Sequence, residues 1–319
     1  WKSGGFVEQA FLNWLEREEN VAFDSTMIDK ITPRPSEEIA RDLENMGIAD
    51  MQPVVTGKRT YIAPFANAER PQYLVIEDRF PNGRPALEKG FGVYLGDFET
   101  VRKSERMKVT VCLNPAHTAV GPLGVVLGQE RFADMLRDLP VTLKMARRVA
   151  FDEGMPVVPD PGILSPKAFA DEVFERFQNL YLGDTNLRLA TDASQGLSVR
   201  FGETIKSYVA KDGTASALVA IPLGIAGFFR YSLGLDDEGK PFELAPDPLV
   251  PEIHEALRQV KLGSPGSYHG ELRPYLSNES IFGIDLYKAG LGEKIEGYFT
   301  EMIAGSGAAL KTIEKYINE

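Results

Sequence analysis

The stretch Glu105–Gly128, ERMKVTVCLNPAHTAVGPLGVVLG, combines reactive side chains with a long run of apolar and small residues. Its first thirteen residues contain Glu105, Lys108, Asn114 and His117. A deprotonated lysine can act as a base, Asn offers a donor and an acceptor, and His can orient or donate. If Lys108, Asn114 and His117 lie close together, the stretch is predicted to form a proton-transfer site. The other interpretation is a surface lysine, a helix cap and a structural histidine.

The backbone conformation of this stretch is predicted only in part. Asn114-Pro115 indicates a helix start, because Asn is a favoured N-cap and Pro is tolerated in the first turn. His117 then lies in the first turn, where the helix dipole disfavours a charged imidazole. The preceding Lys108–Leu113 fits either a strand or a helix that Pro115 kinks. Small residues at near-helical spacing follow and predict close packing of another element: Ala116, Ala119, Gly121, Gly124 and Gly128.

The pattern of Lys108, Asn114 and His117 resembles the catalytic segment of the polyol-specific long-chain dehydrogenases, the mannitol dehydrogenase family. In that family two residues separate the Asn from the His, as they do here. The family Lys usually stands five positions before the Asn, whereas Lys108 stands six before Asn114. The resemblance therefore implies a one-residue bulge, which a π-bulge would absorb.

Other segments resemble the same family in the same order along the chain. They are MIDKITP at 27–33, RFQN at 176–179 and RLATDASQ at 188–195. Two positions depart from the family pattern, because Leu180 stands where a Pro is usual and Gly196 where a Lys is usual. Several motifs in one order are a stronger signal than any single motif.

The resemblance implies a role for each catalytic residue. Lys108 is the general acid and base, and Asn114 helps to stabilise the developing oxyanion. His117 holds other substrate oxygens. Glu105, one helical turn before the lysine, exchanges protons with solvent.

The resemblance also implies residues that bind substrate and cofactor. Arg188 binds substrate oxygens. Asp29, with Ile28 beside it, lies next to the substrate and the nicotinamide, so Asp29 also contacts the cofactor. Gly196 removes a substrate-side lysine that the family pattern would supply. No metal is required.

Residue patterns divide the chain into three expected parts. Residues 1–50 are a helical lead-in with the MIDKITP motif, 51–105 a small β or extended insertion, and 106–319 a helical substrate and catalytic domain. The insertion is indicated by β-prone runs at 54–55, 61–62 and 73–76 among Gly, Pro and Asn. The expected fold class is mainly α. The resemblance implies a multi-helical C-terminal domain of the 6-phosphogluconate dehydrogenase-like type with a small inserted β lobe.

Hydrophobic periodicity and capping residues predict the helices. They are expected at 1–19, 36–46 (ended by Gly47), 132–136, 143–151, 166–177 (capped by Ser165), 201–210, 218–233, 251–260, 291–304 and 305–316. The run at 218–233 is apolar almost all round and predicts a central buried helix, with Arg230 reaching solvent from its end.

A nicotinamide enzyme normally contains a dinucleotide-binding βαβ unit with a Gly-rich turn, and the sequence contains no such pattern. We therefore expect the chain to be a C-terminal substrate domain whose N-terminal Rossmann domain is deleted, cleaved off or unobserved. That domain would be a partner of this chain and would bind most of the NAD or NADP. On its own, the chain would be inactive.

The activity implied by the resemblance is reversible hydride transfer between the cofactor and a sugar alcohol or sugar acid. The residues of the segments MIDKITPRP and CLNPAHT favour fructuronate and mannonate as the substrate pair. Mannitol, arabinitol or tagaturonate is the alternative within the family. An alternative of another class is a non-catalytic remnant that binds sugar acids or a protein partner.

The composition of the chain is compatible with an enzyme that acts on a small molecule. With 43% hydrophobic and 25% charged residues, the chain has an ordinary globular composition. A net charge of −11 argues against nucleic acid or an anionic membrane as a partner. A single cysteine, Cys112, fits a reducing cytoplasm and is expected to be a small buried hydrophobe. Three histidines and one cysteine, scattered along the chain, argue against a zinc site. No apolar run approaches transmembrane length, and a monomer or homodimer is expected.

Overall fold

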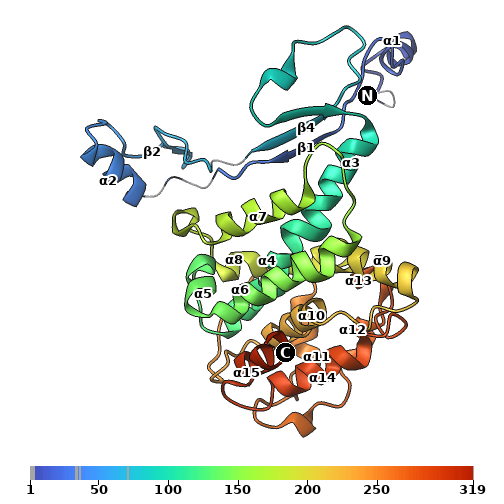
Figure 1. The fold of residues 1–319 in the computed structure, drawn as a ribbon. Helices are drawn as coiled ribbons and strands as arrows, with labels where there is room; N and C mark the ends of the chain where they lie inside the picture. Colours follow the sequence, from blue (N-terminus) through green and yellow to red (C-terminus); the bar gives the residue numbers. More distant parts are fainter. Residues whose placement is uncertain (1–3, 33–34, 36, 70–71, 319) are drawn as a thin grey trace. The chain divides into compact units, whose positions relative to one another are not determined.

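The structure is a computed structural model that describes residues 4–32, 35, 37–69 and 72–318. Contacts divide the chain into two compact units, residues 1–102 and 103–319, and each is described by itself (Figure 1). The expected helix starts at Trp1 and Ser36 fall outside the described residues. The fold is mainly α with few strands, as expected.

The described residues of the first unit form two small sheets. The three-stranded sheet has the order β1 (Thr26–Asp29), β4 (Tyr73–Glu77), β5 (Val93–Gly96), with β1–β4 antiparallel and β4–β5 parallel. The register pairs Asp29 with Tyr73. A second antiparallel pair joins β2 (Val54–Val55) to β3 (Tyr61–Ile62). The three strands expected between 54 and 76 are therefore confirmed, whereas β1 and β5 were missed.

In the described part of the first unit, three α-helices begin. Helix α1 (Gln9–Leu15) is shorter than the expected helix at 1–19, and α2 (Glu37–Asn45) ends before Gly47, whose φ of +88° suits glycine. Helix α3 (Phe98–Arg106) was missed, because its segment was expected to be extended. Its start is capped by Asp97, whose carboxylate accepts the Thr100 N–H at 2.8 Å.

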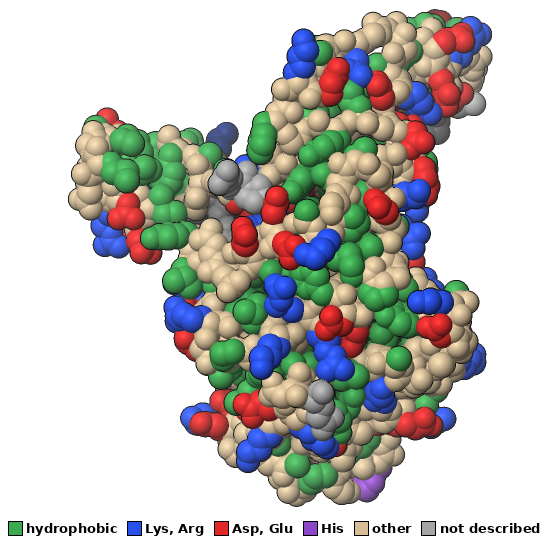
Figure 2. Space-filling model, viewed as in Figure 1, with side chains coloured by type: hydrophobic (Ala, Val, Ile, Leu, Met, Phe, Trp, Pro, Cys, Tyr) green, Lys and Arg blue, Asp and Glu red, His purple; other side chains and the backbone are tan. Residues whose placement is uncertain are grey.

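Hydrophobic side chains are poorly covered in part of the first unit. Around α2, β2 and β3 they are exposed, as Figure 2 shows, and include Met46, Ile48, Val54, Val55 and Ile62. Most of the buried hydrophobic side chains of the described chain lie in the second unit. The main core is therefore the helical one.

The second unit is built on a helical run that continues from α3. A π-helical segment, η2 (Met107–Cys112), joins α3 to α4 (Asn114–Val126), and the Leu113 N–H donates to the Lys108 carbonyl at 3.1 Å. The strand alternative for Lys108–Leu113 is wrong. The wider π turn also accommodates Pro115, which lacks an N–H and would crowd an ordinary turn.

The whole run, Phe98–Val126, is long and apolar enough to cross a membrane by length and composition. The sequence prediction that no run approaches that length was therefore wrong. However, 78% of its apolar window is buried inside the structure, as in the core helix of a globular fold.

Helix α4 packs closely against two other helices. One is α10 (Ala220–Tyr231), which is buried at every position, and the other is α8 (Asn186–Ala190). A Cβ atom added at Gly121 would come within 2.8 Å of Leu189, and one added at Gly124 within 2.4 Å of Asn186. The predicted close packing is confirmed at Gly121 and Gly124 but not at Gly128, which follows the end of α4 and has no atom within 4 Å of an added Cβ. The predicted central buried helix is confirmed.

Arg230 at the end of α10 does not reach solvent as expected. Its exposure is 0%, and its guanidinium donates to the carbonyl oxygens of Met302, Leu235 and Asp236. Buried polar groups need such partners, and backbone carbonyls supply them here. Arg230 is therefore a structural residue.

The remaining elements complete the helical unit (Figure 1). They are α5 (Phe132–Asp138), α6 (Pro140–Arg147), η3 (Arg148–Gly154), η4 (Met155–Val157), α7 (Pro166–Phe177), η5 (Leu180–Leu182), η6 (Ala193–Gly196), η7 (Ser198–Gly202), α9 (Glu203–Asp212), α11 (Val250–Ala256), η8 (Pro265–Ser267), α12 (Arg273–Leu276), α13 (Glu279–Phe282), α14 (Gly292–Met302) and α15 (Ala308–Ile317). The Ser165 side chain caps α7 as predicted, accepting the Ala168 N–H at 3.3 Å.

Candidate active site

Three π-helical segments meet at the candidate site. The segment η2, which carries Lys108, packs against both η3 and η7. The Thr204 hydroxyl donates to the Thr110 carbonyl at 3.2 Å, so a carbonyl of the π turn has a partner. A Cβ at Gly154 of η3 would lie 2.8 Å from the Val111 side chain. Close packing therefore holds η2 in a conformation that isolated helices rarely keep.

Lys108 and Glu105 lie where the π turn begins. Glu105 is exposed near the end of α3, and Lys108 is half-buried in η2. A π segment lies between α3 and α4, at the place where the resemblance implied a one-residue bulge.

Asn114 does not cap a helix, contrary to expectation. The helical run passes through it, and Leu113 occupies the cap position of α4 without a side-chain cap bond. The Asn114 Oδ1 atom is buried and has no hydrogen-bond partner among the described residues. An unsatisfied buried acceptor costs about 1–3 kcal/mol, which a substrate hydroxyl could offset by donating to it.

His117 lies on α4 between two phenylalanine rings. Its ring centroid is 4.1 Å from that of Phe177 in a stacked arrangement and 4.9 Å from that of Phe132 in an edge arrangement. Burial lowers the pKa of His117 to about 3, with Asp184 acting in the opposite direction. The imidazole is therefore neutral at neutral pH, as predicted. The predicted cause was wrong, because the backbone N–H of His117 donates to the Leu113 carbonyl at 3.3 Å and so is not a free donor of a helix end.

Three arginines surround His117 closely enough to lower its pKa: Arg188, Arg200 and Arg176. Arg188 on α8 donates through Nε and an Nη atom to the two carboxylate oxygens of Asp184. These hydrogen bonds raise the pKa of Arg188. Arg176 at the end of α7 is buried. The site is locally basic although the chain carries a net charge of −11.

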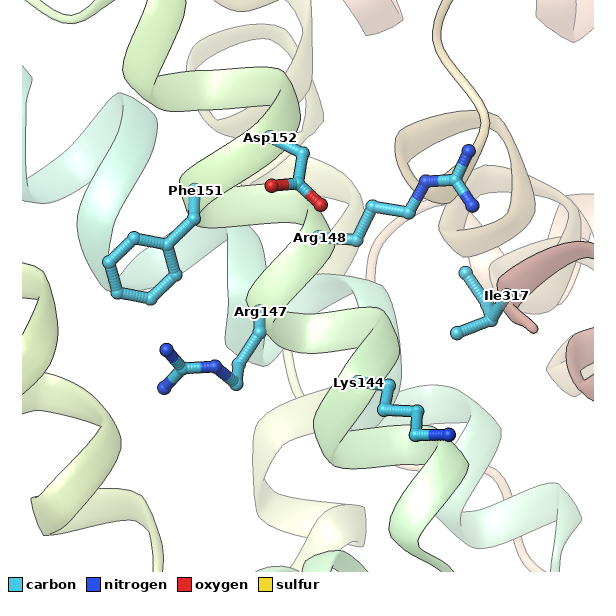
Figure 3. A pocket seen from close by; sticks show the side chains of 6 residues that line it. All are labelled: Lys144, Arg147, Arg148, Phe151, Asp152 and Ile317. Carbon is cyan, nitrogen blue, oxygen red and sulfur yellow. The ribbon is translucent and has the colours of Figure 1, made fainter. Parts of the chain in front are cut away.

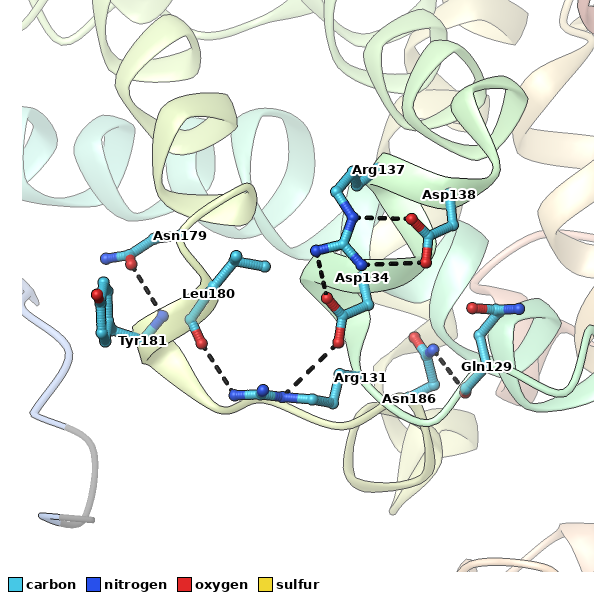
Figure 4. Close-up of polar contacts among 9 residues, drawn as sticks. All are labelled: Gln129, Arg131, Asp134, Arg137, Asp138, Asn179, Leu180, Tyr181 and Asn186. Carbon is cyan, nitrogen blue, oxygen red and sulfur yellow. Dashed lines mark hydrogen bonds and ion pairs between the residues drawn. The ribbon is translucent and has the colours of Figure 1, made fainter. Parts of the chain in front are cut away.

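The segment before α8 is fixed by polar contacts (Figure 4). Arg131 donates to the Leu180 carbonyl at 2.9 Å, and Asn186 donates to the Gln129 carbonyl at 2.9 Å. The Thr185 hydroxyl accepts the Arg188 N–H at 3.2 Å and caps α8. These bonds fix the backbone that presents Arg188.

Asp29 and Ile28 belong to the first unit. Both are in β1, where Asp29 is 1% exposed and Ile28 is 61% exposed. The alternation follows from the strand, whose successive side chains point to opposite faces. Their expected roles beside the nicotinamide and substrate stay predictions.

Sequence reasoning missed several residues of the site. Phe177 and Arg176 were noted only as part of a matching motif, and Phe132 and Arg200 were not noted as site residues. Their signal is weak, because aromatic and basic residues in separate helices reveal their proximity only in the folded chain.

Figure 3 shows a basic pocket lined by other residues. It has a volume of about 370 Å³ and is lined by Lys144, Arg147, Arg148, Phe151, Asp152 and Ile317. Arg148 donates to the Tyr316 carbonyl at 2.9 Å, and Lys144 donates to Asn318 at 3.0 Å. Two of its cations are thus already used to hold the C-terminal helix.

Cys112 lies in η2 and is not a reactive thiol. It is buried, and burial raises its pKa to about 12. The predicted structural role is confirmed. Within the described ranges, no group of three His, Cys, Asp or Glu side chains is arranged to hold a metal ion.

Comparisons with known proteins show which proteins the chain resembles. Residues 100–302 match the family model described as the mannitol dehydrogenase C-terminal domain. A D-mannonate oxidoreductase of Thermotoga maritima is 49% identical over 99% of this chain and 59% of its own length. A mannitol 2-dehydrogenase of Aspergillus fumigatus is 31% identical over 96% of this chain and 55% of its own length.

A solved structure has the same fold. It is a Pseudomonas fluorescens mannitol 2-dehydrogenase in a ternary complex with NAD and D-mannitol, with a TM-score of 0.71 and 23% identity. The match covers 98% of this chain and 57% of that one. The chain thus spans somewhat more than half the length of these relatives, and it belongs to the mannitol dehydrogenase family.

Proposed function

We propose that this chain is the substrate domain of a cytoplasmic NAD(P)-dependent oxidoreductase that interconverts a keto sugar acid and an aldonic acid, with fructuronate and mannonate as the pair. The observation that carries the proposal is the π turn at η2, which supplies the one residue by which the Lys108–Asn114 spacing exceeds the family spacing. The D-mannonate oxidoreductase relative, at 49% identity, favours a sugar acid over a neutral polyol.

Each residue has a defined part in the proposed reaction. In the oxidation direction, Lys108 takes the proton of the substrate hydroxyl, and Glu105 exchanges it with solvent. The Asn114 amide donates to the developing oxyanion or accepts from a neighbouring hydroxyl, and its buried oxygen has no other partner among the described residues. Neutral His117 and cationic Arg188 hold the remaining substrate oxygens.

The nicotinamide cofactor, when bound, supplies or accepts the hydride. The described residues form only a three-stranded sheet and a two-stranded sheet, and neither has the βαβ arrangement with a Gly-rich turn. They do not fit a dinucleotide site of their own. Asp29 is the residue proposed to lie next to the nicotinamide, which a Rossmann domain outside this chain would bind.

Replacing Lys108 with Ala in the full-length enzyme tests this function. Fructuronate reduction with NADH or NADPH should fall by a factor of about 10²–10⁴, because general acid–base catalysis contributes that much. The matched control is Lys167→Ala, an exposed lysine of α7 that pairs with Asp171. Circular dichroism should show both variants folded. Unchanged turnover in Lys108→Ala would exclude this lysine as the base, and no turnover in the wild type would favour a non-catalytic role.

A further inference from the structure

The side chain of Arg200 lies directly over Gly196. A Cβ atom added at Gly196 would come within 2.5 Å of the Arg200 Nε and 2.8 Å of its Cδ and Cζ. Real Cβ atoms do not approach other atoms so closely, so any larger residue at this position must displace the guanidinium. Glycine is therefore required for the observed position of Arg200.

The backbone around Gly196 is held firmly. Asp247 is 9% exposed and accepts the Ser194 N–H at 2.8 Å through one carboxylate oxygen. Its other oxygen accepts the N–H groups of Leu249 and Val250 at 2.8 and 3.1 Å. Because the turn is tied to α11 in this way, a side chain at position 196 would move Arg200 more readily than the backbone.

Arg200 is a cation without a protein carboxylate partner among the described residues. Its Nη1 donates to the Thr118 hydroxyl at 2.8 Å, and Thr118 is 1% exposed and adjacent to His117 on α4. Burial lowers the pKa of Arg200, and no acidic group in the described part of the chain counteracts the effect. Arg188 differs, because Asp184 neutralises it. A half-buried and unneutralised guanidinium is costly unless an anion completes the site.

We propose that Arg200 binds the carboxylate of the substrate, and that Gly196 and Arg200 together set the preference for a sugar acid over its neutral analogue. A guanidinium has five N–H donors, and only one is used by Thr118, so a bidentate contact with a carboxylate is possible. This inference rests on the proposed function and names the residue that distinguishes the substrate class.

The test compares fructuronate with fructose, which has a hydroxymethyl group in place of the carboxylate. In the full-length enzyme, Arg200→Met should lower kcat/KM for fructuronate by about 10- to 100-fold, mainly through KM, and leave fructose reduction unchanged. Gly196→Ala should act in the same direction although Arg200 is retained. Arg137→Met is the matched control, because Arg137 is paired with Asp134 and Asp138 and should not affect either substrate.

Two kinetic outcomes would overturn the proposal. If Arg200→Met lowers kcat/KM equally for both substrates, Arg200 stabilises Thr118 and α4 and does not bind the carboxylate. If the kinetics are unchanged, the substrate carboxylate binds elsewhere. If the wild type reduces neither substrate, the proposed function fails, and calorimetry of mannonate and mannitol binding then tests Arg200 separately.

In that experiment the wild type should bind mannonate more tightly than mannitol, and Arg200→Met should bind the two with similar affinity. A wild type that does not prefer mannonate refutes the inference.

Discussion

The imidazole of His117 stacks on the ring of Phe177 with 4.1 Å between their centroids, although the two residues lie sixty positions apart in the chain. The contact joins α4 to the end of α7. It explains why a residue with a polar ring can be largely enclosed near three arginines, since stacking covers one face of the neutral imidazole.

The depressed pKa of His117 predicts a loss of stability in acid. The pKa is about 3 in the folded chain and 6.5 in the reference state, so the unfolded chain binds the proton first as the pH falls. The stabilising contribution is complete above pH 6.5 and is lost progressively toward pH 3. The slope from this one group is at most about 1.4 kcal/mol per pH unit.

Urea unfolding at pH 7 and at pH 4.5 measures this contribution. His117→Phe should reduce the difference in unfolding free energy between the two pH values, because the substituted ring does not titrate. His269→Ala removes an exposed imidazole and should leave the difference as it is. If His117→Phe shows the full wild-type loss, other groups are responsible.

A second prediction concerns the contact between α4 and α10. A Cβ at Gly224 would lie 2.8 Å from the Cα of Ala119, and a helix backbone cannot move aside locally. Gly224→Ala should therefore lower the unfolding free energy by about 1–3 kcal/mol, the usual effect of overpacking. Chemical denaturation measures the change.

Gly297 provides the matched control for this substitution. It also lies within a helix, α14, but is exposed and has no atom within 4 Å of an added Cβ. Gly297→Ala should raise the unfolding free energy by up to about 1 kcal/mol, because Ala has the higher helix propensity. Two substitutions of the same kind should thus have opposite signs. Equal effects would contradict the close contact at Ala119.

Much of the helical unit could be predicted from the sequence because its signals are local. Ser165 before Pro166 marks the start of α7, and the stripe of small residues on α4 marks a close helix contact. Strand β1 could not be found in this way. Its buried face includes Asp29, and a charged residue on the inner face interrupts the apolar alternation that predicts a strand.

The candidate site could be proposed from the sequence along one helical run but not across helices. Lys108, Asn114 and His117 lie on that run, and the resemblance of their spacing to the family motif implied a one-residue bulge where the π turn is found. Arg176 and Arg200 come from separate elements and approach His117 only through tertiary packing. No local pattern marks such residues, and the space left by Gly196 becomes meaningful only when Arg200 is seen to occupy it.

Asn114 gives a last prediction, in which stability and activity change in opposite directions. Its Oδ1 is buried without a partner among the described residues, so the folded chain bears the cost of an unmade hydrogen bond. Asn114→Leu, of similar size, removes that oxygen and should raise the unfolding free energy by about 1 kcal/mol. In the full-length enzyme the same change should lower kcat by about 10²–10³, the usual effect of removing an oxyanion donor. Denaturation and steady-state kinetics on one preparation measure both. If Asn114→Leu is instead less stable and fully active, Asn114 stabilises the fold and has no catalytic role. A residue kept for catalysis at the expense of stability must give a variant that is more stable and less active.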